Sequence, residues 1–239
     1  MRRSGARVAA IMLMAAFPSL AGCAWGEGAP AGSAPDRTAS VAPAEALSRT
    51  ELEHAALAGT DLDGYDVAQA PTTTRAAHRT ADPSACSPLV HAVGTGTAQA
   101  AGARIGRSLS TKKPGPGITL SLSTYTAEVA SQVIGELRSA AKECETFKDV
   151  QVGFRYDTVE LRPDPGYGDE SVSVRLTQLA AADENEKPVR VPCAVVAVRK
   201  GATVVMFSTY SNPGRPWGKG PAAVPDEVVT TQLDKLDKT

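Results

Sequence analysis

The chain has 239 residues, of which 42% are hydrophobic, and 25 basic and 26 acidic residues give it a formal charge of −1. This length suits a single domain with an adequate core. Basic residues form no cluster and no run interleaved with aromatic residues, so we expect no nucleic-acid partner.

The first 22 residues have the three parts of a bacterial signal peptide. Arg2, Arg3 and Arg7 form a cationic start, and an apolar run follows over residues 8–17. This run is shorter than the ~20 residues that cross a bilayer. The residues after the arginine pair do not fit twin-arginine export, so the general secretory route is favoured.

Residues Leu20-Ala21-Gly22-Cys23 resemble the bacterial lipobox, in which the cysteine thiol accepts a diacylglyceryl group. We predict cleavage before Cys23 and acylation there, with palmitate among the acyl chains. More than one acyl chain gives stable anchoring. The predicted location is the extracytoplasmic face of the cell membrane, with the lipid bilayer as a partner. The alternative is an ordinary signal peptide with a chance cysteine.

Residues 23–46 are rich in Ala, Gly, Pro and Ser and lack apolar periodicity, which predicts a lipidated, disordered tether. A flexible segment of ~22 residues has a root-mean-square span of ~25 Å. Residues 47–239 are predicted to form one extracytoplasmic domain. Without the signal peptide the chain has 22 basic and 26 acidic residues.

Four segments of this domain have the features of helices. Asp82 is the predicted N-cap of the second helix, with Pro83 at its first position. The third helix has an apolar stripe that includes Val129, Val133 and Leu137. The predicted helices lie at residues 47–57, from 82 onward, 126–147 and from 225 onward.

Strand-like alternation follows the long helix in several successive segments. Lys200-Gly201 is predicted to form the tight turn of a hairpin. Strands in direct succession favour antiparallel pairing, because parallel pairs need long crossovers. The predicted fold class is therefore α+β, a single domain with an antiparallel sheet packed against several helices. The predicted strands lie at residues 118–123, 150–161, 171–179, 191–199 and 202–210.

Three cysteines remain after Cys23, and they allow three single pairings. Cys86 and Cys144 each lie on the apolar stripe of a predicted helix, and buried faces of neighbouring helices meet. We therefore predict a Cys86–Cys144 disulfide, in keeping with an oxidising compartment. Cys193 is in phase with apolar residues of a strand, and we favour a buried small hydrophobe over a reactive thiol.

Several segments come in an order that resembles a known family. Together they resemble actinobacterial lipoproteins related to the extracellular sensor domain of receptor Ser/Thr protein kinases, over residues 47–239. The segments are Leu62-Asp63-Gly64-Tyr65, Asp82-Pro83-Ser84-Ala85-Cys86, the helix with Cys144, Gly168-Asp169-Glu170-Ser171 and the hairpin within 195–207.

This resemblance implies an antiparallel sheet packed with helices and braced by disulfides, around a cleft that takes a ligand. Sensor domains of the family often have two disulfides, whereas this chain has cysteines for one, so a second brace is in doubt. No kinase domain is present in the sequence, so any signalling would need a partner.

Motifs for catalysis and metal binding are weak or incomplete. The three histidines lack metal-ligand spacing, and we expect them to be surface or partly packed. Two Ser-x-x-Lys matches lack their companion motifs, and the aspartates at 61, 63 and 66 suit a turn better than a calcium loop. We expect no catalytic residue, no metal and no cofactor, and so no enzyme. The histidines are His54, His78 and His91, and the Ser-x-x-Lys serines are Ser110 and Ser139.

A Pro/Gly-rich segment at residues 211–224 separates the last strand from the last helix. Trp217 in this segment has no periodic apolar neighbours, and Arg215 and Lys219 flank it. An aromatic face beside two cations would suit an anionic or amphipathic ligand. We predict that these three residues line the mouth of a ligand cleft. The alternative is that Trp217 packs on the sheet as a structural lid.

Taken together, the sequence predicts a membrane-anchored lipoprotein with a sensor-like domain that binds a small or amphipathic molecule or a lipid. The alternative is an envelope scaffold or interaction protein with a membrane protein partner. A cell-wall hydrolase is the third hypothesis.

Overall fold

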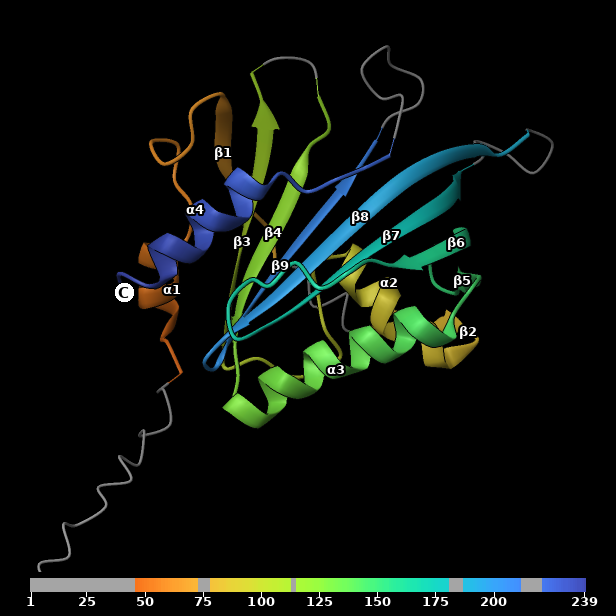
Figure 1. Cartoon of the computed structure of the whole chain (residues 1–239), viewed down its shortest axis with the longest axis horizontal. Coiled ribbons are helices and arrows are strands. Elements are labelled where there is room, and N and C mark those ends of the chain that lie inside the picture. Colours follow the sequence, from red (N-terminus) through yellow and green to blue (C-terminus); the bar gives the residue numbers. More distant parts are fainter. Residues whose placement is uncertain (1–45, 73–77, 113–114, 181–186, 212–220) are drawn as a thin grey trace, which may run out of the picture. The chain divides into compact units, whose positions relative to one another are not determined.

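The computed structural model describes residues 46–72, 78–112, 115–180, 187–211 and 221–239. In these residues nine strands form one antiparallel sheet in the order β1-β3-β4-β9-β8-β7-β6-β5-β2 (Figure 1). The strands are β1 (Tyr65–Ala70), β2 (Ala81–Asp82), β3 (Ala103–Thr111), β4 (Ile118–Thr124), β5 (Phe147–Asp149), β6 (Arg155–Leu161), β7 (Glu170–Ala180), β8 (Val189–Lys200) and β9 (Thr203–Tyr210).

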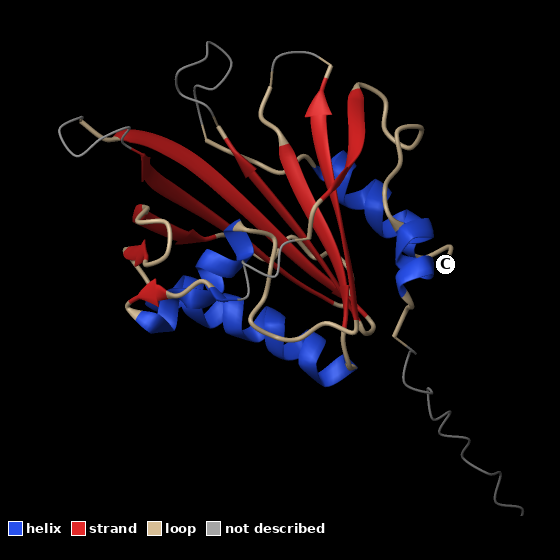
Figure 2. Cartoon of the chain, turned by 180° about the vertical axis from the view of Figure 1, so that it is seen from behind, coloured by secondary structure: helices blue, strands red, loops and turns tan. Residues whose placement is uncertain are grey.

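Helices pack on both faces of this sheet, which confirms the predicted α+β class. Figure 2 shows the helices in two separate groups, one on each side of the strands. Helices α2 and α3 cover one face, and α1 and α4 lie on the other. The helices are α1 (Arg49–Ala55), α2 (Ser87–Val93), α3 (Ala127–Glu143) and α4 (Asp226–Leu236), with a 3₁₀ turn, η2, at Ser84–Cys86.

Alternation along the central strands supplies both cores, because successive side chains of a strand point to opposite faces. Val172, Val174 and Leu176 of β7 pack beneath α2 and α3. Val196 and Val198 of β8 pack on the side of α1 and α4. The predicted β8–β9 hairpin is confirmed, and Gly201 in its turn has a φ of +57°.

Capping residues at the N-termini of α1 and α3 form the hydrogen bonds that their sequence indicates. Ser48 and Glu51 form a capping box on α1, with the Glu51 amide donating to Ser48 Oγ at 3.3 Å. Thr126 caps α3 by accepting a hydrogen bond from the Val129 amide. Helix α3 ends at Glu143, and β5 begins four residues later at Phe147.

The predicted N-cap of the second helix is wrong. Asp82 is the last residue of β2 and pairs with Lys148 of β5. Pro83 has an extended backbone with a ψ of 152°, so the chain turns through η2 before α2 begins at Ser87. The apolar face of this segment is nevertheless buried, as predicted, at Cys86, Leu89 and Val90.

Cys86 and Cys144 form a disulfide, as the two helical stripes predicted. Cys86 ends η2, and Cys144 is the residue that follows the last turn of α3. The bond therefore joins the two helical segments on one face of the sheet across 58 positions of sequence. Cys193 is a free, buried cysteine, which agrees with its interpretation as a small core residue.

Candidate functional site

One area of the sheet lacks a helix on the side of α1 and α4. The buried cluster beneath these helices includes residues of β1, β3, β4 and β9 and Val196 and Val198 of β8, but no residue of β6 or β7. On β7, Ser173, Arg175 and Thr177 alternate with the buried residues and therefore point to this uncovered face. The uncovered part of β6, β7 and β8 is the floor of a groove.

Three rows of paired residues make this floor. Thr177 is paired with Thr158 of β6 and with Pro192 of β8. The next row is Glu160, Arg175 and Ala194, and in the third Ser173 is paired with Val196. The floor is thus polar over β6 and β7 and apolar over β8.

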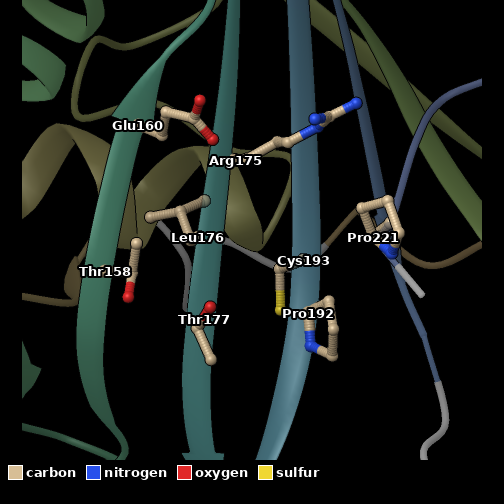
Figure 3. A pocket seen from close by; sticks show the side chains of 9 residues that line it. Thr158, Glu160, Arg175, Leu176, Thr177, Pro192, Cys193 and Pro221 are labelled. Carbon is tan, nitrogen blue, oxygen red and sulfur yellow. The ribbon is translucent and has the colours of Figure 1, made fainter. Parts of the chain in front are cut away.

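Two hollows lie along the floor and form the groove. One has a volume of about 380 Å³ and the other about 280 Å³, and both are lined by Arg175 and Ala222. Figure 3 shows the first hollow, with Pro192 and Pro221 on its apolar side. Arg162 and Tyr167 line the second. We call this groove, over β6 to β8 and beside the segment 221–224, the β7 groove.

Arg175 is the cation at the centre of the β7 groove. Its side chain is half-buried and has no hydrogen bond or ion pair with any other described residue. Glu160 lies directly opposite on β6, but its carboxylate accepts a hydrogen bond from Arg162. Figure 3 shows the Arg175 side chain extending across β8, away from Glu160. A half-buried guanidinium without a carboxylate partner is suited to an anionic ligand group.

A loop between β6 and β7 fixes the rim of the groove. Tyr167 donates from its hydroxyl to Asp226 of α4 at 2.7 Å, and burial together with this bond raises the pKa of Tyr167 to about 12. The Tyr167 amide donates to Ser171 Oγ at 3.1 Å. Ser171 Oγ in turn donates to Asp164, and this bond lowers the pKa of Asp164. Hydrogen bonds within the protein therefore hold this loop in place.

The segment Gly168-Asp169-Glu170-Ser171, which contributed to the family resemblance, has a structural role. Gly168 has a φ of +59°, and a Cβ there would lie 2.5 Å from the carbonyl oxygen of Arg199. Asp169 accepts a hydrogen bond from the Gly201 amide at 2.7 Å, and both acids of the segment bind Arg199. The segment thus attaches the rim loop to the β8–β9 hairpin.

The residues predicted to bind ligand, Trp217, Arg215 and Lys219, lie outside the described residues, as does the predicted lipidation site Cys23. They stay predictions. The described residue that follows this stretch, Pro221, lines the β7 groove.

Cys193 borders the groove, but its side chain is 3% exposed and packs in the core beneath α2 and α3. Burial raises the pKa of this thiol to about 11. Because the thiolate is the nucleophilic form of cysteine, this environment suppresses its reactivity.

The histidines lie in different surroundings. His54 and His78 are exposed, whereas His91 is buried and its Nε2 lies 2.6 Å from the carbonyl oxygen of Arg79. Burial lowers the pKa of His91. Among the described residues no group of three or more His, Cys, Asp or Glu side chains could hold a metal ion.

The other weak motifs have structural surroundings. Ser139 lies exposed on α3, and Ser110 lies exposed on β3. Asp61 accepts hydrogen bonds from the Ala58 amide and from Lys235 Nζ, each at 2.6 Å, which ties the turn after α1 to α4. Asp61 is therefore part of a turn, as the sequence favoured.

Sequence reasoning did not find Arg175, Glu160 or Tyr167. The polar alternation of Ser173, Arg175 and Thr177 within an apolar strand was a signal for one uncovered face. It could not show which face the helices leave open, because that depends on where α1 and α4 pack.

No protein-family model matches the chain, and no curated protein sequence matches it significantly. The fold, however, is similar to a solved one. The extracellular domain of PknH from Mycobacterium tuberculosis superposes with a TM-score of 0.51 at 13% sequence identity, covering 81% of this chain and 97% of that chain. An uncharacterised protein from Mycobacterium smegmatis gives a TM-score of 0.35 at 10% identity, over 73% of this chain and 90% of that one.

The chain therefore has a single-sheet α+β fold with a groove on one face of the sheet. The particular likeness is to the extracellular domain of PknH, and at this identity it concerns the fold alone. In the part of the chain that the structure describes, no helix has both the length and the apolar character needed to cross a membrane.

Proposed function

We propose that this protein is a lipoprotein, anchored through Cys23 on the extracytoplasmic face of the cell membrane, whose domain binds an amphipathic anion in the β7 groove. The lipobox-like sequence supports the anchor. The Cys86–Cys144 disulfide and the fold shared with an extracellular domain support an oxidising, extracytoplasmic compartment. The proposed role is binding without catalysis, as in a sensor.

One observation carries the ligand class, namely Arg175, which has no partner among the described residues and lies at the boundary between a polar and an apolar half of the groove. A carboxylate or phosphate would form paired hydrogen bonds with its guanidinium. An alkyl or similar apolar part would lie along Pro192, Ala194 and Pro221. Pockets that bind small molecules are commonly apolar with a few convergent polar groups, and the β7 groove has this composition.

Native mass spectrometry of the purified chain tests for a co-purified small molecule. Titration with a medium-chain fatty acid, and with the alcohol of the same chain length, then tests the role of Arg175. Arg175→Gln should weaken binding of the acid roughly 10- to 100-fold, because a hydrogen bond to a charged group contributes about 1.5–3 kcal/mol. Binding of the alcohol should change little.

Arg49→Gln is the matched control, since Arg49 is exposed on α1, outside the groove. Equal affinity of the wild type and Arg175→Gln for the acid would show that Arg175 does not bind the anion. Loss of alcohol binding in Arg175→Gln would indicate a disrupted groove in place of a lost charge contact.

A further inference from the structure

The turn between β5 and β6 exposes three large apolar side chains within five residues. Val150 is 52% exposed, Val152 is 50% exposed and Phe154 is 39% exposed. The other large hydrophobic residues exposed in the described part of the chain, Val189 and Tyr210, lie elsewhere in the sequence. Burial in the core does not explain why this turn is apolar.

The backbone of this turn is held by the buried carboxylate of Asp149. Asp149 Oδ1 accepts hydrogen bonds from the amides of Gln151 at 3.0 Å and Val152 at 3.2 Å. The Asp149 backbone bonds across the turn, with its amide donating to the Phe154 carbonyl and its carbonyl accepting from Gly153. Gly153 has a φ of +78°, a conformation that glycine adopts without strain.

A second segment braces the turn from the side. Arg79 donates from Nε to Asp149 Oδ2 at 2.7 Å, and the Asp149 side chain is fully buried. The Val150 amide donates to the Thr80 carbonyl, and Gln151 Oε1 accepts from the Thr80 amide at 2.7 Å. The three apolar side chains are therefore presented by a rigid turn, so that little conformational entropy is lost when they bind a surface.

Two cations lie on the strands that flank the turn. Lys148 of β5 and Arg155 of β6 are paired in register, and both are exposed. Neither has an ion pair with another described residue, although Asp82 is paired in register with Lys148 on its other side. β5 and β6 lie at the opposite end of the sheet from β1 (Figure 1).

A lipid bilayer fits this arrangement better than a protein surface does. A specific protein interface buries about 1,200 Å² or more, with close shape complementarity. Three side chains on one turn supply only a small part of such an area. A bilayer needs no complementary shape, since apolar side chains enter the acyl boundary while cations stay near the lipid phosphates.

We propose that the β5–β6 turn docks the domain on an anionic bilayer, with Val150, Val152 and Phe154 inserted and Lys148 and Arg155 at the headgroups. Half-exposed side chains of this size give weak binding on their own. The proposal rests on the Cys23 anchor of the proposed function, which makes docking intramolecular and raises the effective concentration of the membrane. It does not depend on the ligand groove.

The test uses the full acylated chain in vesicles of phosphatidylglycerol and phosphatidylcholine. An environment-sensitive fluorophore is attached through Val152→Cys, which leaves the buried Cys193 unlabelled. We expect blue-shifted emission and quenching by lipids brominated on their acyl chains. A label attached through Gln69→Cys, at an exposed position of β1 at the other end of the sheet, should show neither. Flotation of the chain reports anchoring separately.

Three further variants test insertion and the two cations separately from any effect of the label. Val150→Ser with Phe154→Ser should abolish the shift at position 152, with unchanged melting temperature. Lys148→Gln and Arg155→Gln should each lower the equilibrium constant for docking on anionic vesicles about fivefold, and by less in high salt.

A label at position 152 that stays water-like while the chain is anchored would overturn the proposal. So would a shift that persists in the double serine variant. Equal docking on vesicles of phosphatidylcholine alone would overturn the part assigned to Lys148 and Arg155. If the chain does not float, the same label is read at saturating vesicle concentration, where the absence of a shift again contradicts docking.

Discussion

The buried side chain of Gln232 in α4 accepts a hydrogen bond from the backbone amide of Leu57, 3.1 Å away, just beyond the end of α1. The same side chain donates from Nε2 to the carbonyl oxygen of Ala55 at 2.7 Å. Gln232 is 0% exposed, so its amide lies in the core and satisfies backbone groups that a helix end leaves free. One residue thus joins two helices that are about 175 positions apart in sequence.

We expect Gln232→Leu to destabilise the domain by about 2–4 kcal/mol. The substitution keeps an apolar side chain in the core but leaves a buried amide and a buried carbonyl without partners, and each such group costs about 1–3 kcal/mol. Urea denaturation of the full chain measures the difference in the free energy of unfolding. Gln69→Leu at an exposed position of β1 is the control, and an equal effect of the two substitutions would show that the buried bonds contribute little.

The disulfide should contribute a comparable amount. A closed loop of about 59 residues corresponds to ~4 kcal/mol on the chain-entropy model. Replacing Cys86 and Cys144 together by Ala should therefore lower the free energy of unfolding by about 2–4 kcal/mol. Peptide mapping without reductant should find Cys86 linked to Cys144 and Cys193 as a thiol. A peptide linking Cys193 to either partner would contradict the pairing.

The parts of the fold that sequence could predict are those determined locally. The apolar stripe of α3, the capping residue Thr126 and the turn at Gly201 are each set by residues close in sequence. The alternation of β7 and β8 also follows from neighbouring residues. β7 and β8 are inner strands of the sheet, so burial imposes a regular pattern on them.

The sequence did not predict β1 or β3 as strands. The pattern of β3 is explained only by contacts with distant residues. β3 contains Arg107, which is 8% exposed, so its sequence does not resemble a buried strand. Its guanidinium donates to the Leu57 carbonyl and forms an ion pair with Glu53 of α1. Such partners lie about 50 positions away and give no local signal. The same limit applies to the β7 groove, which exists because α1 and α4 pack elsewhere.

Cys193 should make stability depend on pH in alkaline solution. Burial raises the pKa of its thiol from 9.0 to about 11, so the folded state keeps a proton that the unfolded state loses. Between these values the unfolded state binds fewer protons, and the free energy of unfolding must fall as pH rises. The full contribution is up to about 3 kcal/mol.

Tyr156 and Tyr65 also have pKa values raised by burial, so the wild-type curve contains several contributions. The difference between the wild type and Cys193→Ala isolates the thiol. The variant should lose less stability than the wild type over this interval, whatever its stability at neutral pH. Parallel curves would show that the thiol has an ordinary pKa. A thiol reagent should label Cys193 only after denaturant is added.

The Arg79–Asp149 pair should contribute far more to stability than an exposed pair. The Asp149 side chain is 0% exposed and that of Arg79 is 17% exposed, whereas Arg190 in the pair with Asp157 is 61% exposed. Removing one member of a buried pair typically costs about 3–5 kcal/mol, because the other charge stays buried without a partner. An exposed pair contributes less than about 1 kcal/mol, since water and salt screen it.

Asp149→Asn and Asp157→Asn make the same chemical change at these two places. We expect the first to lower the free energy of unfolding by about 3 kcal/mol and the second by less than about 1 kcal/mol. Asp149→Asn should also loosen the β5–β6 turn, because its carboxylate accepts from the Gln151 and Val152 amides. Amide hydrogen exchange should therefore rise at residues 150–153 in this variant alone. Similar losses of stability and unchanged exchange would show that the turn is held by its backbone bonds and not by the Asp149 carboxylate.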